Sequence, residues 1–254
     1  MIRIVRPPEP PALPTVRATQ LAAARDAMIA GRAITFDGYT IVKDDLFMMQ
    51  QRKCCYCEKR EEQAKYRDVE HFRPKARYWW LAWTWENLLF ACVDCNREHK
   101  REQFPIAPGS VPLAPEQSPP GNEHPLLIDP TADDVDPMHE IVYRRMTIQR
   151  EERWMPIGQT DRGRETIRIC GLDRQELVTS YTHHVREFVR PKLNTFLATC
   201  RGGDAQAIHK AWSTLHRGLL GHARPFRALS HDALAALVDP ALRERHGLRL
   251  PRPA

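Results

Sequence analysis

Two pairs of cysteines are the residues whose type and spacing indicate chemistry most directly. Cys54 and Cys57 form one C-x-x-C pair, and Cys92 and Cys95 form another. This spacing lets a tight turn direct two thiolates at one ion, and two such pairs complete a tetrahedral Zn²⁺ site. Because 34 residues separate Cys57 from Cys92, more than the roughly 15 to 20 of a simple four-cysteine finger, a folded segment is expected between the pairs.

The other three cysteines are not expected to bind this ion. Cys55 is predicted to point into the core, and Cys170 and Cys200 lie in stretches with the pattern of amphipathic helices, where cysteine acts as a small core residue. The alternative for the two pairs is two unrelated clusters of buried or redox-active thiols. A thioredoxin-like motif, however, needs one pair only and leaves the other unexplained.

A second group of polar residues lies between and beside the cysteine pairs. Glu70 and His71 stand in the stretch DVEHFRPK, Asn87 precedes LLFA, and Asn96 follows the last cysteine of the second pair. We predict one short strand that ends near His71, a second strand over residues 88–91, and a helix that begins at Asn96. This arrangement brings Glu70, His71 and Asn96 toward one spot.

In order and in type, these residues resemble the HNH, or ββα-metal, nucleases of the four-cysteine type. The resemblance implies that His71 is the general base and that Asn87 braces the loop between the strands. It also implies that Glu70 and Asn96 hold a catalytic divalent ion and that the four cysteines hold a structural zinc ion. Two features depart from the family pattern: Glu70 replaces the commoner Asp, and the loop between the strands is rich in Trp.

The chemistry of these residue types agrees with such roles. Phosphodiester hydrolysis requires a group that deprotonates a water and a cation that stabilises the developing charge. An imidazole such as His71 meets the first need, and the oxygens of Glu70 and Asn96 suit Mg²⁺ or Mn²⁺ better than a thiolate site would. Without the flanking cysteines, the Glu70-His71 dipeptide would be interpreted as a surface ion pair or a strand-end histidine.

Basic residues near His71 and on the predicted helix are candidate phosphate-binding residues. Each of them alone is more typical of a solvated surface than of a binding site. The candidates are Arg73, Lys75, Arg77, Arg97, Lys100 and Arg101.

Several nearby residues have alternative interpretations. His99 is either a third metal ligand or an exposed helix residue, and the exposed position is the expectation. Four tryptophans within residues 78–85 either stack on bases or pack the small module against the helical part, and packing is favoured. His183 and His184 have no partner at ligand spacing and are treated as ordinary helix residues.

Charge is distributed unevenly along the chain. Of the formal net charge of +6, residues 105–143 contribute seven acidic groups and no basic group, whereas residues 144–254 contribute 20 basic and 11 acidic groups. A basic surface favours a polyanion such as nucleic acid, although it also serves solubility. No apolar run reaches the roughly 18 to 20 residues of a membrane span, and the charged, proline-containing start lacks the apolar stretch of a secretory signal. A cytoplasmic protein is therefore expected.

A wider resemblance extends over most of the chain. The strings IRIVRPPEPP, CCYCE, VEHFRPK, WENLLFACVDCN, HPLLIDPTADD and IRICGLDRQEL are together similar to the PtuB-type HNH proteins. These proteins are effectors of Septu and retron-linked anti-phage systems and act beside an ATPase. The resemblance therefore implies an HNH endonuclease that works with a PtuA-like ATPase partner, with nucleic acid, DNA in the first instance, as its substrate.

Two other functions are compatible with parts of the sequence. A catalytically silent zinc module that binds nucleic acid or a protein would keep the four cysteines but would not require Glu70, His71 and Asn96 together. An HNH toxin that cleaves RNA or tRNA would keep every one of these residues. Nothing in the sequence distinguishes a DNA substrate from an RNA substrate.

The expected fold is α+β and mostly α, with a small zinc-stapled ββα-metal module embedded in a helical protein. Helices are predicted at residues 18–30 and 40–51, and repeatedly from about residue 160 onward. The proline-rich residues 105–125 are predicted to form a linker or surface loop. The expected division is an N-terminal arm with helices (1–50), the HNH nuclease module with its zinc knuckles (51–104), a proline-rich and acidic connection (105–143) and a C-terminal helical region (144–254).

Overall fold

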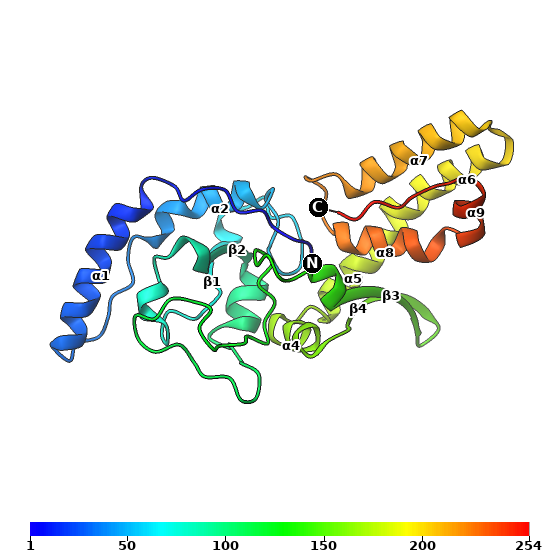
Figure 1. The fold of residues 1–254 in the computed structure, drawn as a ribbon. Helices are drawn as coiled ribbons and strands as arrows, with labels where there is room; N and C mark the ends of the chain where they lie inside the picture. Colours follow the sequence, from blue (N-terminus) through cyan, green and yellow to red (C-terminus); the bar gives the residue numbers. More distant parts are fainter. Residues whose placement is uncertain (254) are drawn as a thin grey trace.

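A computed structural model describes residues 1–253 of the chain. The N-terminal part holds the helices and strands up to the second cysteine pair, and the C-terminal part holds a hairpin and most of the helices (Figure 1). One continuous cluster of buried apolar residues, which includes Tyr56, Trp83, Trp154 and Tyr181, spans both parts. The two parts therefore share one hydrophobic core. None of the helices in the described part is long and apolar enough to cross a membrane.

The small module has the two strands and the helix that the sequence predicts. Strand β1 (Arg67–His71) pairs antiparallel with β2 (Leu88–Cys92), with Arg67 opposite Cys92 and His71 opposite Leu88. The helix that follows, η5 (Asp94–Lys100), begins two residues before the expected Asn96 and has π-helical hydrogen bonding. This type of helix is rare and is found frequently at functional sites.

The N-terminal helices cover one side of this module. Helix α1 (Leu13–Ile29) begins earlier than the expected residue 18, with Pro14 in its first turn, where proline is tolerated because the N–H groups there have no helical partner. The stretch predicted at 40–51 forms a 3₁₀ turn, η1 (Tyr39–Val42), and helix α2 (Lys43–Met49). Helix α2 packs on both strands of the module.

The tryptophan side chains of the loop between the strands are buried in the hydrophobic core, which confirms the prediction that they pack the module rather than stack on bases. The four indole side chains are all at most 9% exposed. Three of them donate from Nε1 to distant carbonyl oxygens: Trp83 to Asp37 at 2.6 Å, Trp80 to Gln117 at 2.8 Å and Trp85 to Pro7 at 3.0 Å. The buried residues are Trp79, Trp80, Trp83 and Trp85.

The proline-rich stretch 105–125 contains no helix or strand, as predicted. It is nevertheless anchored, because an isolated bridge joins Ile106 to Pro125 and the buried Glu123 accepts a hydrogen bond from the Tyr78 hydroxyl. The stretch is thus a loop folded back on the module rather than a free linker.

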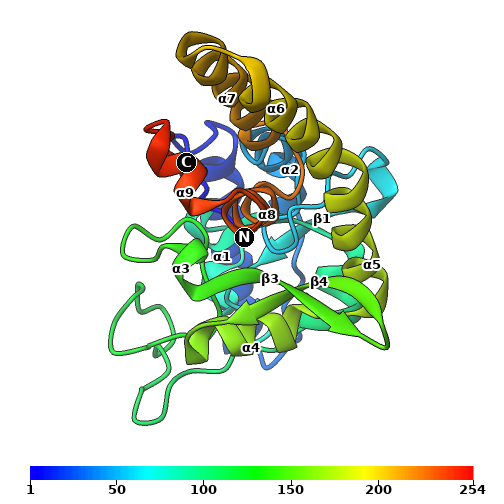
Figure 2. The same cartoon turned by 90° about the vertical axis from the view of Figure 1, so that its right-hand side faces the viewer.

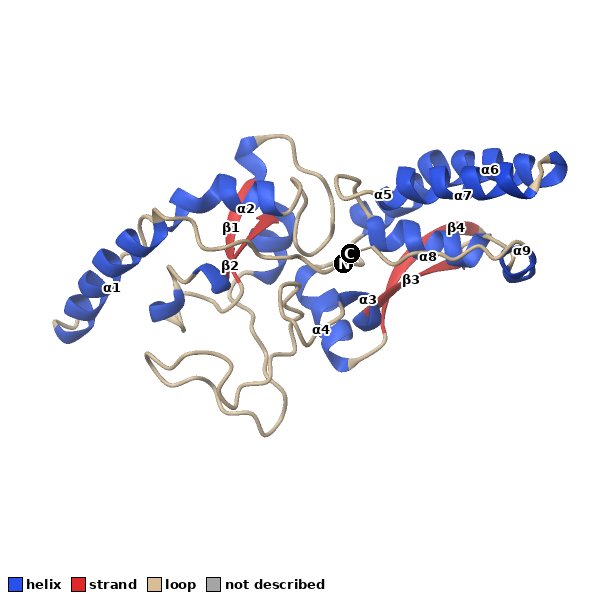
Figure 3. Cartoon of the chain, turned by 45° about the horizontal axis from the view of Figure 1, so that its top comes forward, coloured by secondary structure: helices blue, strands red, loops and turns tan. Residues whose placement is uncertain are grey.

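The C-terminal part begins with a hairpin that we did not predict. Strand β3 (Ile141–Ile148) pairs antiparallel with β4 (Glu151–Gly158), and this sheet is separate from β1–β2 (Figure 3). The turn residues Gln149 and Arg150 both have positive φ, 52° and 68°. Because Asn-Gly or Asp-Gly usually marks such a turn, Gln-Arg carries no hairpin signal. The expected boundary between residues 143 and 144 lies inside β3.

The helices predicted beyond residue 160 are present. Helix α4 begins at Asp161, where the Thr160 hydroxyl accepts a hydrogen bond from the Gly163 N–H at 3.0 Å. The helices of this part are α3 (Pro137–Glu140), α4 (Asp161–Cys170), α5 (Gln175–His184), the π-helix η6 (Val185–Val189), α6 (Arg190–Gly202), α7 (Ala205–Leu220), α8 (Arg227–Leu237) and α9 (Pro240–Arg245). Helix α8 packs on β3, and α4 and α5 pack on β4. Helices α6 and α7 form an antiparallel pair in which α6 packs on η6 and α7 on α8 (Figure 2).

Candidate functional site

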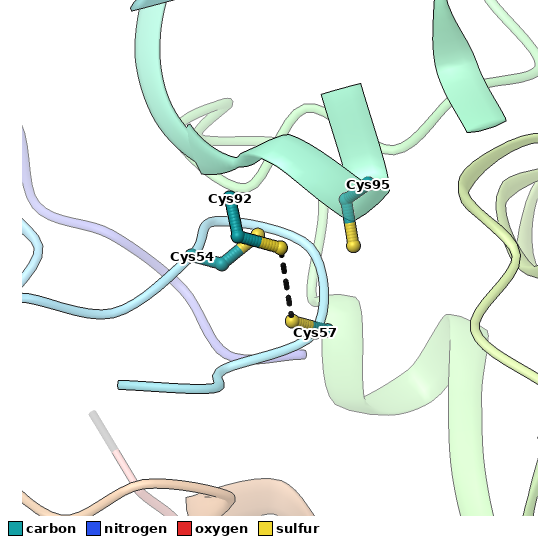
Figure 4. Close-up of side chains that lie close together, drawn as sticks. All are labelled: Cys54, Cys57, Cys92 and Cys95. Atoms are coloured by element: carbon teal, nitrogen blue, oxygen red, sulfur yellow. Dashed lines mark hydrogen bonds between the residues drawn. The ribbon is translucent and has the colours of Figure 1, made fainter. Parts of the chain in front are cut away.

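The four predicted zinc cysteines form one buried cluster. Their Sγ atoms all lie within 4.8 Å of one another, and the Cys57 and Cys92 Sγ atoms are 3.9 Å apart (Figure 4). Four thiolates bound tetrahedrally with Zn–S bonds of about 2.3 Å would lie about 3.8 Å apart. The donor set and the separations therefore fit Zn²⁺.

Local backbone geometry brings the two cysteine pairs together. Cys54 and Cys57 lie on one turn, which closes when the Cys54 N–H bonds to the Lys59 carbonyl oxygen at 3.0 Å, and Cys92 and Cys95 lie at the junction of β2 and η5 (Figure 4). The Cys55 N–H donates to the Phe90 carbonyl oxygen of β2 at 3.0 Å, so the turn is joined directly to the strand. Cys55 itself is buried outside the cluster, as expected.

The two remaining cysteines also stand apart from the cluster. Cys170 is fully buried at the end of α4, and Cys200 is half-buried on α6. The prediction that they are packing residues is confirmed for Cys170 and holds in part for Cys200.

One basic residue beside the cluster was missed from the sequence. Arg174, between α4 and α5, directs Nη1 toward Cys95 Sγ at 3.6 Å and donates from the same atom to the Gly171 carbonyl oxygen at 2.8 Å. Burial disfavours the charged form, but the neighbouring thiols outweigh this effect and raise the Arg174 pKa. Since four thiolates outweigh the charge of one zinc ion, a cation at this place stabilises the bound cluster.

His71 lies at the end of β1, where its ring is buried and hydrogen-bonded. Its side chain is 8% exposed, and Nε2 lies 2.9 Å from the Ala82 carbonyl oxygen. A carbonyl oxygen only accepts, so Nε2 carries the proton and Nδ1 is left with a free lone pair. Burial lowers the pKa of His71 to about 4. The imidazole is therefore neutral at pH 7 and able to accept a proton.

Asn87 holds the two ends of the tryptophan-rich loop together. Its Oδ1 accepts the Arg73 N–H at 2.8 Å, and its Nδ2 donates to the carbonyl oxygens of Arg73 and Leu81 at 3.0 and 3.1 Å. The side chain is 3% exposed. These three bonds fix the segment that follows His71 relative to the segment that contains Ala82.

Glu70 points to the other face of β1, because neighbouring strand residues alternate. It is 1% exposed, and its Oε1 accepts hydrogen bonds from Lys100 Nζ at 2.6 Å and from the Tyr56 hydroxyl at 3.0 Å. Burial raises the pKa of Glu70, and the Lys100 ammonium opposes that rise. Tyr56 lies within the first C-x-x-C turn, so this carboxylate also links the strand to the zinc cluster.

Asn96 contacts an acidic residue that the sequence analysis did not single out. Its Nδ2 lies 3.2 Å from Asp68 Oδ2, and Arg97 forms a two-point ion pair with the same carboxylate at 2.8 and 2.5 Å. Asp68 precedes Glu70 by two residues and thus shares its strand face. The two-residue repeat of a strand was the signal in the sequence that could have pointed to Asp68. Glu70 and Asn96, the two expected metal ligands, are each engaged with another residue in this structure.

A single cleft of about 290 Å³ nevertheless collects most of the predicted residues. Glu70, His71, Asn96, Lys75 and Arg97 all line it. The other lining residues are Tyr39, Thr40, Lys43, Arg67, Asp68, Val69, Pro74, Arg101 and Glu102. Basic side chains outnumber acidic ones in this lining, as the binding of a phosphodiester backbone requires. The contribution of residues 39–43 was missed, because this segment carries no motif.

Two predicted phosphate-binding residues are buried instead, and these expectations are wrong. Arg73 is 8% exposed and its Nε donates to Glu123 Oε2 at 2.7 Å. Lys100 is fully buried between Glu70 and the His71 carbonyl oxygen, which it reaches at 3.0 Å. A buried lysine or arginine occurs almost only when paired, so both are structural ion-pair partners.

Three other predicted residues also lie outside the cleft lining, one of them the bracing Asn87. Arg77 bonds to the Phe104 carbonyl oxygen at 2.9 Å. His99 packs on the end of α4, where a Cβ on Gly171 would lie only 2.4 Å from His99 Nδ1. The expectation of an exposed position is therefore wrong: His99 is half-buried, and it does not line the cleft that holds Glu70 and Asn96.

The module consists of two strands and a helix, with His71 at the end of the first strand and four clustered cysteines at its base. Comparison with known sequences shows which class of protein has such a module. A sequence model of the HNH endonuclease family matches residues 54–102. This range contains the four clustered cysteines together with Glu70, His71, Asn87 and Asn96. Residues 54–102 therefore match the HNH endonuclease family, as the residues of this segment predicted.

More specific relatives are found among the Septu proteins. The chain is 30% identical to the Septu protein PtuB of Bacillus mycoides strain KBAB4 over 199 residues, which cover 70% of this chain and 64% of that protein. It is 42% identical to the Septu protein PtuB of Bacillus thuringiensis over 73 residues, 27% of this chain and 28% of that protein. The predicted resemblance to PtuB is confirmed, and the matches span less than two thirds of each relative.

Proposed function

We propose that this protein is a metal-dependent endonuclease that hydrolyses phosphodiester bonds in nucleic acid, with DNA as the expected substrate. The observation that carries the proposal is His71, a buried neutral imidazole with a free Nδ1 in a cleft lined by basic side chains. An HNH domain match over the same residues supports it.

In the proposed reaction, His71 Nδ1 removes a proton from the attacking water while the Ala82 carbonyl oxygen holds the ring in place. Lys75, from the loop after β1, and Arg97, from η5, both line the cleft and bind phosphate oxygens of the substrate. The proton transfer and the phosphate binding thus come from this chain's own side chains.

A divalent ion would be held by the oxygens of Glu70 and Asn96, with Asp68 as a further hard donor on the same strand face. This donor set fits Mg²⁺ or Mn²⁺, although the ion must compete with Lys100 for Glu70. When bound, the ion stabilises negative charge on the reacting phosphate and the leaving oxygen.

We further propose that the nuclease serves anti-phage defence together with a PtuA-like ATPase. The support is the similarity to two Septu PtuB proteins, one of which extends over 70% of this chain. An unrestrained nuclease would attack the nucleic acid of its own cell, so an ATPase partner that holds it inactive until infection is consistent with this role.

The test uses the purified protein, alone and with the PtuA-like ATPase, on end-labelled DNA and RNA with Mg²⁺ or Mn²⁺. Cleavage that needs the divalent ion and is lost in His71→Ala supports the nuclease proposal. If the protein cleaves RNA but not DNA, its substrate is RNA and the expected DNA substrate is wrong. Binding of nucleic acid without cleavage under every condition would favour a silent zinc module instead.

A further inference from the structure

One wall of the cleft comes from a segment outside the matched domain. Tyr39, Thr40 and Lys43 line the cleft, whereas the HNH match begins at residue 54. The opposite walls belong to β1 and η5. The HNH domain as matched is therefore only part of the site, and residues 39–43, from η1 and the start of α2, complete it.

Tyr39 contacts both His71 and Lys75. Its ring meets the His71 imidazole edge to face, with centroids 4.7 Å apart and planes at 76°. The Lys75 ammonium donates to the Tyr39 hydroxyl at 2.9 Å and lies 4.4 Å from the ring centroid. An edge-to-face aromatic pair and a cation–π contact are both directional interactions. Tyr39 therefore fixes the relative position of the proposed base and a proposed phosphate-binding residue.

The segment that carries Tyr39 is fastened by a buried tryptophan of the loop. Trp83, which is fully buried, donates to the Asp37 carbonyl oxygen at 2.6 Å and stacks on Phe36 with ring centroids 5.8 Å apart. Trp83 directly follows Ala82, whose carbonyl oxygen accepts the His71 Nε2–H. One residue thus anchors both the Tyr39 segment and the loop that orients the base.

Gly38 allows the chain to enter the cleft at this point. Its φ of +82° lies in the left-handed region, and a Cβ there would lie 2.7 Å from Val16 Cγ1 of α1. The glycine lets the segment pass close to α1 and turn, so that the next residue, Tyr39, reaches His71.

We propose that Tyr39 is a positioning residue of this active site, whose ring holds the His71 imidazole and whose hydroxyl holds the Lys75 ammonium where the substrate phosphate binds. The inference rests on the proposed nuclease function and adds a residue from outside the HNH domain to it. The hydroxyl bonds to Lys75, whereas the ring contacts both His71 and Lys75, so removal of the hydroxyl alone can be compared with removal of the whole ring.

The experiment compares Tyr39→Phe, which keeps the ring, with Tyr39→Leu, which loses the ring and the hydroxyl. Steady-state cleavage by the full chain should show a raised KM and a nearly unchanged kcat for Tyr39→Phe, because the hydrogen bond that places Lys75 is lost while the ring stays on His71. Tyr39→Leu should in addition lower kcat by about 10- to 100-fold, the effect of a misplaced catalytic group. Tyr66→Phe, at a residue 40% exposed and outside the cleft lining, is the matched control.

A double-mutant cycle and a direct probe of the histidine distinguish positioning from general stabilisation. Lys75→Met should raise KM at least as much as Tyr39→Phe does, and the double variant should have the KM of Lys75→Met alone, because the Tyr39 hydroxyl affects KM only through Lys75. The ring-proton NMR shifts of His71 should move in Tyr39→Leu and stay in place in Tyr66→Phe, with zinc content and thermal midpoint unchanged in both.

The outcomes separate this inference from the nuclease proposal. If the wild type cleaves nucleic acid and Tyr39→Leu cleaves it with wild-type kcat and KM, the positioning role is wrong while the nuclease function stands. If the wild type cleaves no substrate under any condition, the nuclease function is wrong and the positioning role, defined for that reaction, fails with it. If Tyr39→Leu has a lower kcat and a higher KM than the wild type, and Tyr39→Phe has the wild-type kcat but a higher KM, the result supports both the nuclease function and the positioning role of Tyr39.

Discussion

Lys100 Nζ lies 2.6 Å from Glu70 Oε1, and both side chains are at most 1% exposed. The two residues come from η5 and β1, so their ion pair joins the helix to the strand beneath the proposed active site. The Tyr56 hydroxyl completes the environment of the carboxylate at 3.0 Å. Removal of one charge leaves the other buried without a partner, which is far costlier than the loss of an exposed ion pair.

We therefore expect Lys100→Met to lower the free energy of unfolding by about 3 to 5 kcal/mol. The double variant Glu70→Gln with Lys100→Met should recover part of this loss, because no unpaired charge remains. Urea unfolding of the zinc-loaded proteins measures both values, with the exposed Lys210→Met of α7 as the control. A Lys100→Met protein as stable as the control would show that the pair is not formed in solution.

Removal of zinc should unfold the module. Four thiolates in one buried cluster hold η5 and the first cysteine turn together, and the free energy of metal binding contributes directly to folding in such small units. Elemental analysis should find about one zinc per chain, and Cys92→Ser should lower both zinc content and thermal midpoint. Cys200→Ser, half-buried on α6 away from the cluster, should change neither. Folded wild-type protein without zinc would contradict the metal site.

Variants of the proposed base, His71, and of the proposed metal ligand, Asn96, should differ in how their cleavage activity responds to the concentration of the divalent ion. His71→Ala removes only the proton acceptor, so cleavage should fall by about 10²- to 10⁴-fold at every Mg²⁺ concentration. Asn96→Ala should weaken the binding of the divalent ion, so higher Mg²⁺ or Mn²⁺ should recover part of the activity. Zinc content and circular dichroism check that both variants are folded. Wild-type cleavage by folded His71→Ala would place the base elsewhere.

His184, on α5, is a second buried histidine, and it does not line the cleft. Its Nε2 is 2.9 Å from the Ser230 hydroxyl oxygen, and its ring stacks on Phe188 and meets Phe226 edge to face. Burial lowers the pKa of His184 to about 4. The Glu58 carboxylate opposes this shift and the neighbouring His183 adds to it.

The sign of the resulting pH dependence follows from proton uptake. Between the unfolded pKa of about 6.5 and the folded pKa of about 4, the unfolded chain binds a proton on His184 that the folded chain does not. Stability is therefore lost as the pH falls through this window, by about 2 kcal/mol between pH 7 and pH 5. Urea unfolding should show this loss reduced by that amount in His184→Gln but not in the exposed His139→Gln. An equal loss in all three proteins would mean that His184 titrates normally.

The defence role predicts a stable complex. When this chain is co-expressed with a PtuA-like ATPase, the two should purify together by affinity and size exclusion, and the complex should cleave nucleic acid less than the isolated chain until the ATPase is triggered. If the isolated chain is vigorously active and binds no such ATPase, the defence role must be abandoned. The HNH domain assignment would be unaffected, because it depends on the match to residues 54–102.

The amino-acid sequence by itself determined the parts of this protein that depend on local spacing. The C-x-x-C pairs, the strand that ends at His71 and the position of Asn87 follow from short patterns, since a tight turn or a two-stranded ladder involves near neighbours. The long helical run beyond residue 160 was predictable for the same reason, because helical periodicity is local. Polar turn residues without a glycine concealed the hairpin β3–β4.

Tertiary structure alone decided which charged residues are free to act. Arg73 pairs with Glu123, 50 residues away, and Lys100 with Glu70, so two basic residues that look like phosphate ligands in sequence are buried. Tyr39 reaches His71 only because Trp83 fastens the backbone at Asp37. Contacts of this kind depend on how distant segments pack, and a sequence pattern with a period of two or four residues carries no information about them.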